Sequence, residues 1–130
     1  MEKRNVLLVD DDQVFNFINK KTLEGIDAVN EIHTALNGQQ ALDLINDYYS
    51  GTRSLPEIIF LDLNMPLMDG FQFLEGFRKL SLPGIGNVKV IIVTSSDNPK
   101  DIQRARSLGI DHYLTKPVSE DDLHEILSEI

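Results

Sequence analysis

Short runs of aliphatic residues recur along this sequence, and each run has the length of a β-strand. The five runs are residues 6–9, 31–35, 58–61, 88–93 and 110–114. Three of them contain VLLV, IIFL and VKVIIV, which are apolar at nearly consecutive positions, as is typical of strands buried on both faces by helices. The runs at 31–35 and 110–114 are more mixed, so we expect them nearer the edges of a sheet.

The segments between these runs place apolar residues at helical spacing. Two such faces are Ala41, Leu42, Ile45, Tyr48 and Tyr49, and then Phe73, Leu74, Phe77 and Leu80. Asn98 followed by Pro99 predicts the start of a further helix, which Gly109 can end, and Ser119 with Asp122 predicts the start of the last one. The expected buried faces of these two helices are Ile102, Ala105, Leu108, Leu123, Ile126, Leu127 and Ile130.

Five strands that alternate with five helices predict a (βα)5 unit. Right-handed crossovers turn this pattern into a parallel sheet covered on both faces, which is a doubly wound α/β domain. A length of 130 residues with 42% hydrophobic content suits one packed core, so we expect a single domain over residues 1–130. The most polar connection, residues 49–56, is expected to be a long surface loop.

The charge balance excludes several classes of function. Twelve Lys and Arg against 21 Asp and Glu give a net charge of −9, which repels phosphate backbones and anionic membrane surfaces. We therefore expect no nucleic-acid binding by this domain and no membrane association. The absence of cysteine excludes disulfides, thiolate metal sites and a cysteine nucleophile. With no signal-peptide pattern in MEKRNVLLVDDD and no apolar stretch near 20 residues, the expected location is cytoplasmic.

Polar side chains follow four of the predicted strands. They are Asp10, Asp11 and Asp12 after the first, Asp62 after the third, Thr94, Ser95 and Ser96 at the fourth, and Thr115 and Lys116 at the fifth. In open parallel sheets the ligand site lies beyond the carboxyl ends of the strands. The sequence therefore predicts one site that gathers carboxylates, hydroxyls and an ammonium group.

Three of these carboxylates, from Asp10, Asp11 and Asp62, cannot lie close together fully ionised without a counter-cation, because like charges raise one another's pKa. A magnesium ion would resolve this conflict, since it takes carboxylate oxygens together with phosphate oxygens, and no His or Cys is placed to favour zinc. Lys116 can neutralise a phosphoryl oxygen and the Thr94 hydroxyl can donate to another. This combination indicates phosphoryl-transfer chemistry.

Four segments together resemble a known family. They are VLLVDDD at 6–12, IIFLDLNMPLMDG at 58–70, VIIVTSS at 90–96 and YLTKPV at 113–118. In this order and spacing the chain resembles the response-regulator receiver domain of two-component signalling, over essentially its whole length and most like the stand-alone chemotaxis regulators. The resemblance implies a flavodoxin-like fold with a five-stranded parallel sheet of order 2-1-3-4-5.

By this resemblance, Asp62 is the phosphoacceptor, and its phosphoryl group comes from a phosphohistidine on a sensor histidine kinase or a histidine phosphotransfer protein. Asp11 matches a direct Mg²⁺ ligand, Asp10 matches an acidic residue that acts largely through water, and the backbone carbonyl of Asn64 matches the remaining protein ligand. The resemblance implies a signalling switch that assists its own phosphorylation and dephosphorylation, and is not an enzyme acting on other substrates.

The same resemblance assigns the moving parts of the switch. Thr94 and Lys116 match the switch hydroxyl and the phosphate-binding lysine, and Tyr113 matches the aromatic switch position. The Lys116–Pro117 peptide bond is commonly cis in this family. The surface that changes on phosphorylation corresponds to about residues 98–130, and the output is partner binding or onward phosphotransfer. Because family members dimerise through varied surfaces, the sequence predicts no particular oligomeric state.

Other interpretations of the same residues stay open at this point. A haloacid-dehalogenase-like phosphohydrolase would use Asp10 as nucleophile and Asp12 as acid/base, but it leaves Asp62 unexplained. A flavodoxin-like FMN binder would need a phosphate-cradling loop where this chain has DDDQV, and a partner-only pseudo-receiver would not need an intact acceptor set. Asp12 can simply cap the following helix, and Tyr113 can simply cover the sheet edge.

Overall fold

Strands and helices alternate along the whole chain. The computed structural model describes residues 3–50, 55–65, 67–80, 82, 84–95, 98–110 and 112–130, without the side chains of residues 48–50. The elements are β1 (Arg4–Val9), α1 (Gln13–Glu24), β2 (Val29–Ala35), α2 (Gly38–Ser50), β3 (Ile58–Leu61), α3 (Gly70–Arg78), a short 3-10 helix (Ile85–Asn87), β4 (Lys89–Thr94), α4 (Pro99–Ser107), β5 (His112–Thr115) and α5 (Glu120–Glu129). Within the described part of the chain, each helix is too short or too polar to cross a membrane.

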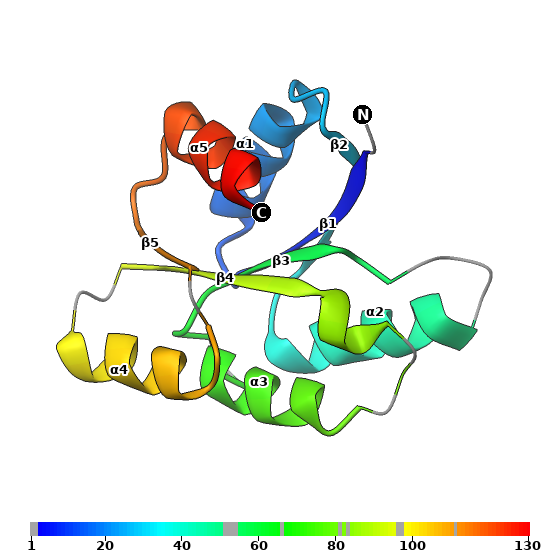
Figure 1. Cartoon of the computed structure of the whole chain (residues 1–130), viewed down its shortest axis with the longest axis vertical. Coiled ribbons are helices and arrows are strands. Elements are labelled where there is room, and N and C mark those ends of the chain that lie inside the picture. The colour runs from blue at the N-terminus through cyan, green and yellow to red at the C-terminus, as the bar shows by residue number, and fades with distance from the viewer. Residues whose placement is uncertain are drawn as a thin grey trace.

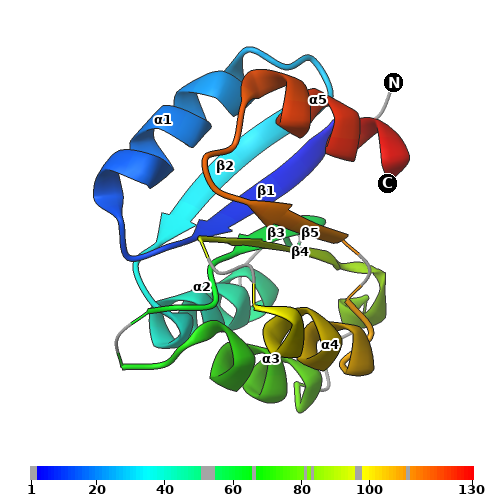
Figure 2. The same ribbon diagram turned by 90° about the vertical axis from the view of Figure 1, so that its left-hand side faces the viewer.

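The five strands form one parallel sheet in the order β2-β1-β3-β4-β5. Helices α1 and α5 cover one face of this sheet, and α2, α3 and α4 cover the other (Figure 1). The second view shows the same three layers, with α1 lying along β1 and β2 (Figure 2). The predicted doubly wound α/β fold with strand order 2-1-3-4-5 is confirmed.

The core is divided in two by the sheet, because successive residues of a strand point to opposite faces. In β1, Val6 and Leu8 pack on the side of α1 and α5, whereas Leu7 and Val9 pack on the side of α2 and α3. All four side chains are buried, as are the four residues of β3. The consecutive apolar runs of the sequence thus serve two separate apolar layers, while the mixed runs form the edge strands β2 and β5, as expected.

The helix starts follow the predicted capping residues. The Asp12 carboxylate accepts hydrogen bonds from the first turn of α1, and Asn98 accepts one from the Lys100 N–H at the start of α4. Ser119 and Asp122 form a reciprocal capping box at the start of α5. A second capping box, at Asp69, starts α3 and was not predicted. These caps satisfy backbone N–H groups that have no partner inside the helix.

The structure differs from the sequence predictions at several element boundaries. Strand β1 begins at Arg4, before the predicted run at 6–9, and β2 begins at Val29, before the predicted run at 31–35. Both strands are longer because backbone pairing extends past the apolar positions. In α4 only Ala105 of the expected face is buried, and Ile102 and Leu108 are half-buried, since α4 lies at the margin of its layer. Residues 51–54 of the expected surface loop, and the Tyr48 and Tyr49 side chains, lie outside the described part of the chain.

We expect Gly70→Ala to lower the free energy of unfolding by about 1–3 kcal/mol, because a Cβ at this position would overpack a tight backbone contact. That Cβ would lie 2.5 Å from the carbonyl oxygen of Asp62 and 2.8 Å from the Cα of Leu63. Urea unfolding measures the change. Gly86→Ala is the matched control, since its Cβ would meet nothing within 4 Å. Equal stability of the two variants would contradict the close approach.

Candidate functional site

The site lies at the carboxyl ends of the strands, where the backbone holds its residues in register. Beyond the strand ends, the Asp10 N–H donates to Ala35 O (3.0 Å) and the Asp62 N–H donates to Val9 O (2.9 Å). The Lys116 N–H donates in the same way to Thr94 O (2.8 Å). The sheet's hydrogen bonding therefore fixes the backbone of both acidic residues and of the lysine before any side chain interacts.

Three carboxylates meet at this edge. One carboxylate oxygen from each of Asp10, Asp11 and Asp62 lies within 4.8 Å of the other two. Asp10 is 2% exposed and Asp62 is 5% exposed, whereas Asp11 faces solvent. An all-oxygen donor set of this kind, open to solvent on one side, suits a hard divalent cation such as Mg²⁺.

Lys116 supplies the positive charge of the site. Its Nζ lies 2.7 Å from Asp10 Oδ2 and 3.8 Å from Asp62 Oδ2. The aromatic ring of Phe15 lies against the same ammonium, with its centroid 4.3 Å from Nζ. One ammonium group therefore faces two buried carboxylates and one ring.

Backbone N–H groups contact the two buried carboxylates, and one side-chain amide contacts the backbone of Asp10. The Asp12 N–H donates to Asp10 Oδ1 (2.9 Å), and the Asn64 N–H makes a long contact with Asp62 Oδ1 (3.4 Å). The buried Asn16 donates from Nδ2 to the backbone carbonyl of Asp10 (2.9 Å), which ties α1 to the end of β1. Asp62 is thus the less fully bonded of the two buried carboxylates.

Burial and mutual repulsion act on the acids of this site. The pKa of Asp62 is raised from 3.8 to about 6, chiefly by burial and then by the negative charge of Asp10, while the Lys116 charge and the Asn64 N–H oppose the rise. Burial also raises the pKa of Asp10, against the opposing effects of its contacts with Lys116 and the Asp12 N–H. The apo site therefore binds protons more readily than exposed carboxylates do, and a bound cation would reverse this tendency.

Thr94 and Tyr113 lie on neighbouring strands and on the same face of the sheet. Register pairs Ile92 with Tyr113 and Thr94 with Thr115, so Tyr113 is the diagonal neighbour of Thr94. Thr94 is fully buried, and the Asn64 side-chain amide contacts its hydroxyl at 3.4 Å. Tyr113 is half-buried against the apolar layer beneath α3 and α4. A movement of the Thr94 hydroxyl would therefore first affect the position of Tyr113 and the apolar layer beneath α3 and α4.

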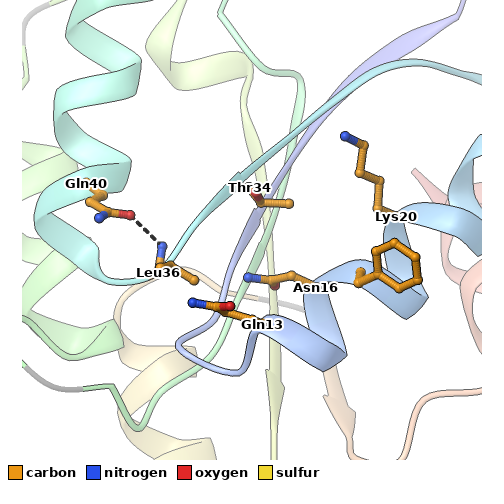
Figure 3. A pocket seen from close by; sticks show the side chains of 7 residues that line it. Gln13, Asn16, Lys20, Thr34, Leu36 and Gln40 are labelled. Atoms are coloured by element: carbon orange, nitrogen blue, oxygen red, sulfur yellow. Dashed lines mark hydrogen bonds between the residues drawn. The ribbon is translucent and has the colours of Figure 1, made fainter.

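A cavity of about 450 Å³ lies beside the site, between α1, the end of β2 and the start of α2 (Figure 3). Its wall includes Gln13, Asn16 and Lys20 from α1, and Gln40 from α2, whose side chain accepts a hydrogen bond from the Leu36 N–H (2.9 Å). None of the predicted site residues lines it, although Asn16 contacts both its wall and Asp10. The cavity is adjacent to the acidic cluster but separate from it.

The structure brings the predicted site residues to one edge of the sheet. Asp10, Asp11, Asp62, Thr94 and Lys116 lie there as the topology predicts. Asn64 lies two residues after Asp62, and the Lys116–Pro117 peptide bond is cis. Ser96 and Pro66, which belong to the motifs singled out in the sequence, lie outside the described residues.

Asp12 does not point into the site. Its side-chain Oδ1 accepts from the N–H groups of Val14 (3.0 Å) and Phe15 (3.1 Å), so it is committed to capping α1. Two residues that contact the site, Phe15 and Asn16, were not predicted from the sequence. Both residues lie in the first helical turn after the acidic loop, so the sequence indicates that they lie close to the end of the preceding strand. Their contacts with Lys116 and with the Asp10 carbonyl depend on the packing of α1, which the sequence does not show.

Fold and site together define a doubly wound α/β domain with an acidic cluster at the carboxyl edge of its sheet. The sequence model of the response regulator receiver domain family matches residues 6–128. The chain belongs to this family, whose members are phosphorylation-dependent switches of two-component signalling. Phosphorylation on aspartate and the use of Mg²⁺ are general properties of the family. No comparison supports the phosphohydrolase alternative.

Curated relatives and solved structures agree with this assignment. The chain is 30% identical to the probable methanogenesis regulatory protein FilR2 of Methanothrix harundinacea over 125 residues, 96% of this chain and 79% of the relative. It is 29% identical to the nitrate/nitrite response regulator NarL of Escherichia coli K12, covering 98% of this chain and 55% of that protein. The chain therefore spans about half the length of NarL and only 28% of a Treponema pallidum protein-glutamate methylesterase/protein-glutamine glutaminase.

Among solved structures, a two-component response regulator from Cytophaga hutchinsonii superposes with a TM-score of 0.86 at 29% identity, covering 99% of this chain and 97% of the other. The chemotaxis protein CheY4 of Vibrio cholerae superposes with a TM-score of 0.83 at 27% identity, covering 98% of both chains. Both are similar to this chain over nearly their full length.

The raised pKa of Asp62 predicts a pH-dependent cost to stability. A carboxyl with a folded-state pKa above its unfolded value stabilises the fold below about pH 4 and loses that contribution as pH rises through about 6. We expect Asp62→Asn, in the absence of Mg²⁺, to raise the free energy of unfolding at pH 7.5 by about 3 kcal/mol relative to the wild type, with little gain at pH 4.

Urea unfolding at the two pH values, with EDTA, checks this expectation. Asp27→Asn, at an exposed position, is the control and should change stability little at either pH. Addition of Mg²⁺ should stabilise the wild type more than Asp62→Asn, because the cation binds the folded carboxylates. A stability difference that is the same at pH 4 and pH 7.5 would show that burial of the charge is not its cause.

Proposed function

We propose that this chain is a receiver that accepts a phosphoryl group on Asp62 and changes its partner-binding surface in response. The observation that carries the proposal is the placement of the buried Asp62 carboxylate beside a lysine ammonium and two further acids. We propose that the domain comprises residues 1–130, works in the cytoplasm and turns over no separate substrate.

The transfer step requires an oxygen nucleophile and a stabilised phosphoryl group. An Asp62 oxygen attacks the phosphorus of a phosphohistidine on a sensor histidine kinase or a histidine phosphotransfer protein. The new P–O bond forms as the P–N bond breaks, and its electron pair returns to the imidazole nitrogen of the donor. Lys116 stabilises the charge on the phosphoryl oxygens, since its ammonium already lies 3.8 Å from the Asp62 carboxylate.

Mg²⁺ fits the donor set of this site. The carboxylates of Asp10, Asp11 and Asp62, together with the Asn64 carbonyl, are the residues that would hold it, with Asp10 acting largely through water. The cation would supply charge neutralisation for the phosphoryl oxygens. The close approach of two buried acids, whose pKa values are both raised, supports a bound cation as the working state of the site.

Phosphorylation then acts on Thr94 and, through it, on Tyr113. The added phosphoryl oxygens offer hydrogen-bond acceptors, and the Thr94 hydroxyl moves to donate to one of them. Tyr113, its diagonal neighbour on β5, follows into the space near α4. We propose residues 98–130 as the surface that changes, with partner binding or onward phosphotransfer as its output.

The packing of α4 supports this choice of responding surface. The helix buries Ala105 against the core, and its other described residues are exposed or half-buried. Arg104 fastens it to α3, with its guanidinium 4.1 Å from the centroid of the Phe71 ring and 3.7 Å from the Glu75 carboxylate. Such a helix is held by few buried contacts and can change position at a modest cost in free energy.

We further propose that the phosphodonor protein docks on α1. Val14, Phe17 and Ile18 are apolar side chains on α1 that are 66%, 62% and 56% exposed, on the helix that starts directly after the acidic loop. A partner bound there would bring its phosphohistidine to the carboxyl edge of the sheet. Phe17 also lines the cavity between α1, β2 and α2, so this surface has a recess beside the exposed ring.

A small phosphodonor tests the central proposal. Incubation with acetyl phosphate and Mg²⁺ should add one phosphate of about 80 Da to the intact mass, and the adduct should be acid-stable but base-labile, as expected of an acyl phosphate. Asp62→Ala and EDTA should each abolish it, whereas Asp27→Ala should leave it. An adduct that survives Asp62→Ala, or an Asp10-dependent phosphatase activity, would contradict the assignment.

The docking surface is tested by comparing two kinds of donor. Ile18→Glu should slow phosphotransfer from the preferred autophosphorylated histidine kinase at least tenfold, because it places a charge on the apolar contact, while the rate with acetyl phosphate stays unchanged. The preferred kinase is found by profiling purified kinases of the source organism one at a time. Gln103→Glu on α4 adds the same charge elsewhere and should be neutral. Equal losses with both donors, or no loss with either, would refute docking on α1.

A further inference from the structure

We propose that Phe15 is a positioning residue for phosphoryl transfer, whose ring holds the Lys116 ammonium between Asp10 and Asp62. The proposal rests on the proposed role of Asp62 as acceptor and adds a member to the site. Its basis is the contact between the ring of Phe15 and Lys116 Nζ, 4.3 Å from the ring centroid, within the site.

The ring is itself fixed from two sides. The Phe15 N–H donates to Asp12 Oδ1 (3.1 Å), so the cap of α1 sets the position of the residue in the first helical turn. The half-buried side chain packs on the apolar layer beneath α1 and α5, beside a small gap whose lining also includes Leu8, Phe60 and Leu123. The ring therefore presents a defined face to the lysine.

The ring restricts the position of the Lys116 ammonium without competing with a phosphoryl oxygen for it. The face of an aromatic ring carries negative charge density and attracts a cation, most strongly where water is partly excluded. The Lys116 side chain is 21% exposed, and its long stem gives it many rotamers to lose on ordering. A third carboxylate in the place of Phe15 would have to release the ammonium before a phosphoryl oxygen could take it, whereas a ring imposes no such step.

A second lysine–phenylalanine pair on α1 provides an internal comparison. Lys21 Nζ lies 5.7 Å from the centroid of the Phe17 ring, and Phe17 is 62% exposed. This contact is longer, more exposed and away from the acidic cluster. Lys21→Met therefore removes a lysine–phenylalanine contact from the same helix without touching the lysine of the site.

The first test measures the rate of Asp62 phosphorylation by acetyl phosphate with saturating Mg²⁺. Phe15→Leu, which keeps an apolar side chain, should lower the rate about three- to tenfold. Phe15→Tyr, which keeps the ring, should stay within about twofold of the wild type, as should Lys21→Met. A wild-type rate in Phe15→Leu, or an equal loss in Phe15→Tyr, would overturn the positioning role.

The second test detects the contact between the Phe15 ring and Lys116 directly and needs no phosphorylation. Protons next to the Lys116 ammonium that lie over a ring face show an upfield ring-current shift in NMR spectra, and Lys116→Arg assigns them. The shift should be present in the wild type and in Phe15→Tyr, and lost in Phe15→Leu. Phe15→Met serves in its place if the leucine variant does not fold. An unshifted Lys116 signal in the wild type would overturn the proposal.

The two tests separate this inference from the proposed function. A wild-type protein that shows the ring-current shift but gains no phosphate on Asp62 would refute the acceptor role and leave the contact established. A wild-type protein that is phosphorylated on Asp62, with a rate and a Lys116 signal that do not respond to Phe15→Leu, would uphold the acceptor and refute the positioning role.

Discussion

Crowding of like charges at the carboxyl edge of the sheet is the constraint on which the site depends. Parallel pairing forces the ends of β1 and β3 together, and the backbone bonds from Asp10 and Asp62 to the neighbouring strands leave their carboxylates no room to separate. One ammonium, from Lys116, offsets part of the repulsion. The remaining excess of negative charge favours a bound cation, so the electrostatics of the site follow from the topology.

Much of this arrangement could be predicted from the sequence, because it follows from short-range rules. Aliphatic runs gave the strands, and Asp12, Asn98 and Ser119 marked helix starts through their local capping chemistry. Asp10 and Asp62 could be placed together despite their separation in sequence, because any parallel sheet brings adjacent strand ends to one edge. The prediction needed topology but no knowledge of side-chain packing.

Other features depend on packing and lay beyond such rules. The half-burial of Ile102 and Leu108 reflects how far α4 sits from the centre of its layer, which periodicity alone does not express. Phe15 is a similar case, because helical spacing indicates that it faces inward but not that its ring meets a lysine about 100 residues later in the chain. The diagonal placement of Tyr113 beside Thr94 likewise required the observed register of β4 and β5.

The two faces of α1 carry separate tasks, and this separation bears on how such proteins diversify. Phe15, Asn16 and Asn19 face the interior, whereas Val14 and Ile18 face solvent. After gene duplication, the outward positions can diverge while the inward positions stay the same. Val14 and Ile18 lie one helical turn apart, so substitutions on one side of α1 can change its exposed surface without disturbing the contacts of Phe15 and Asn16.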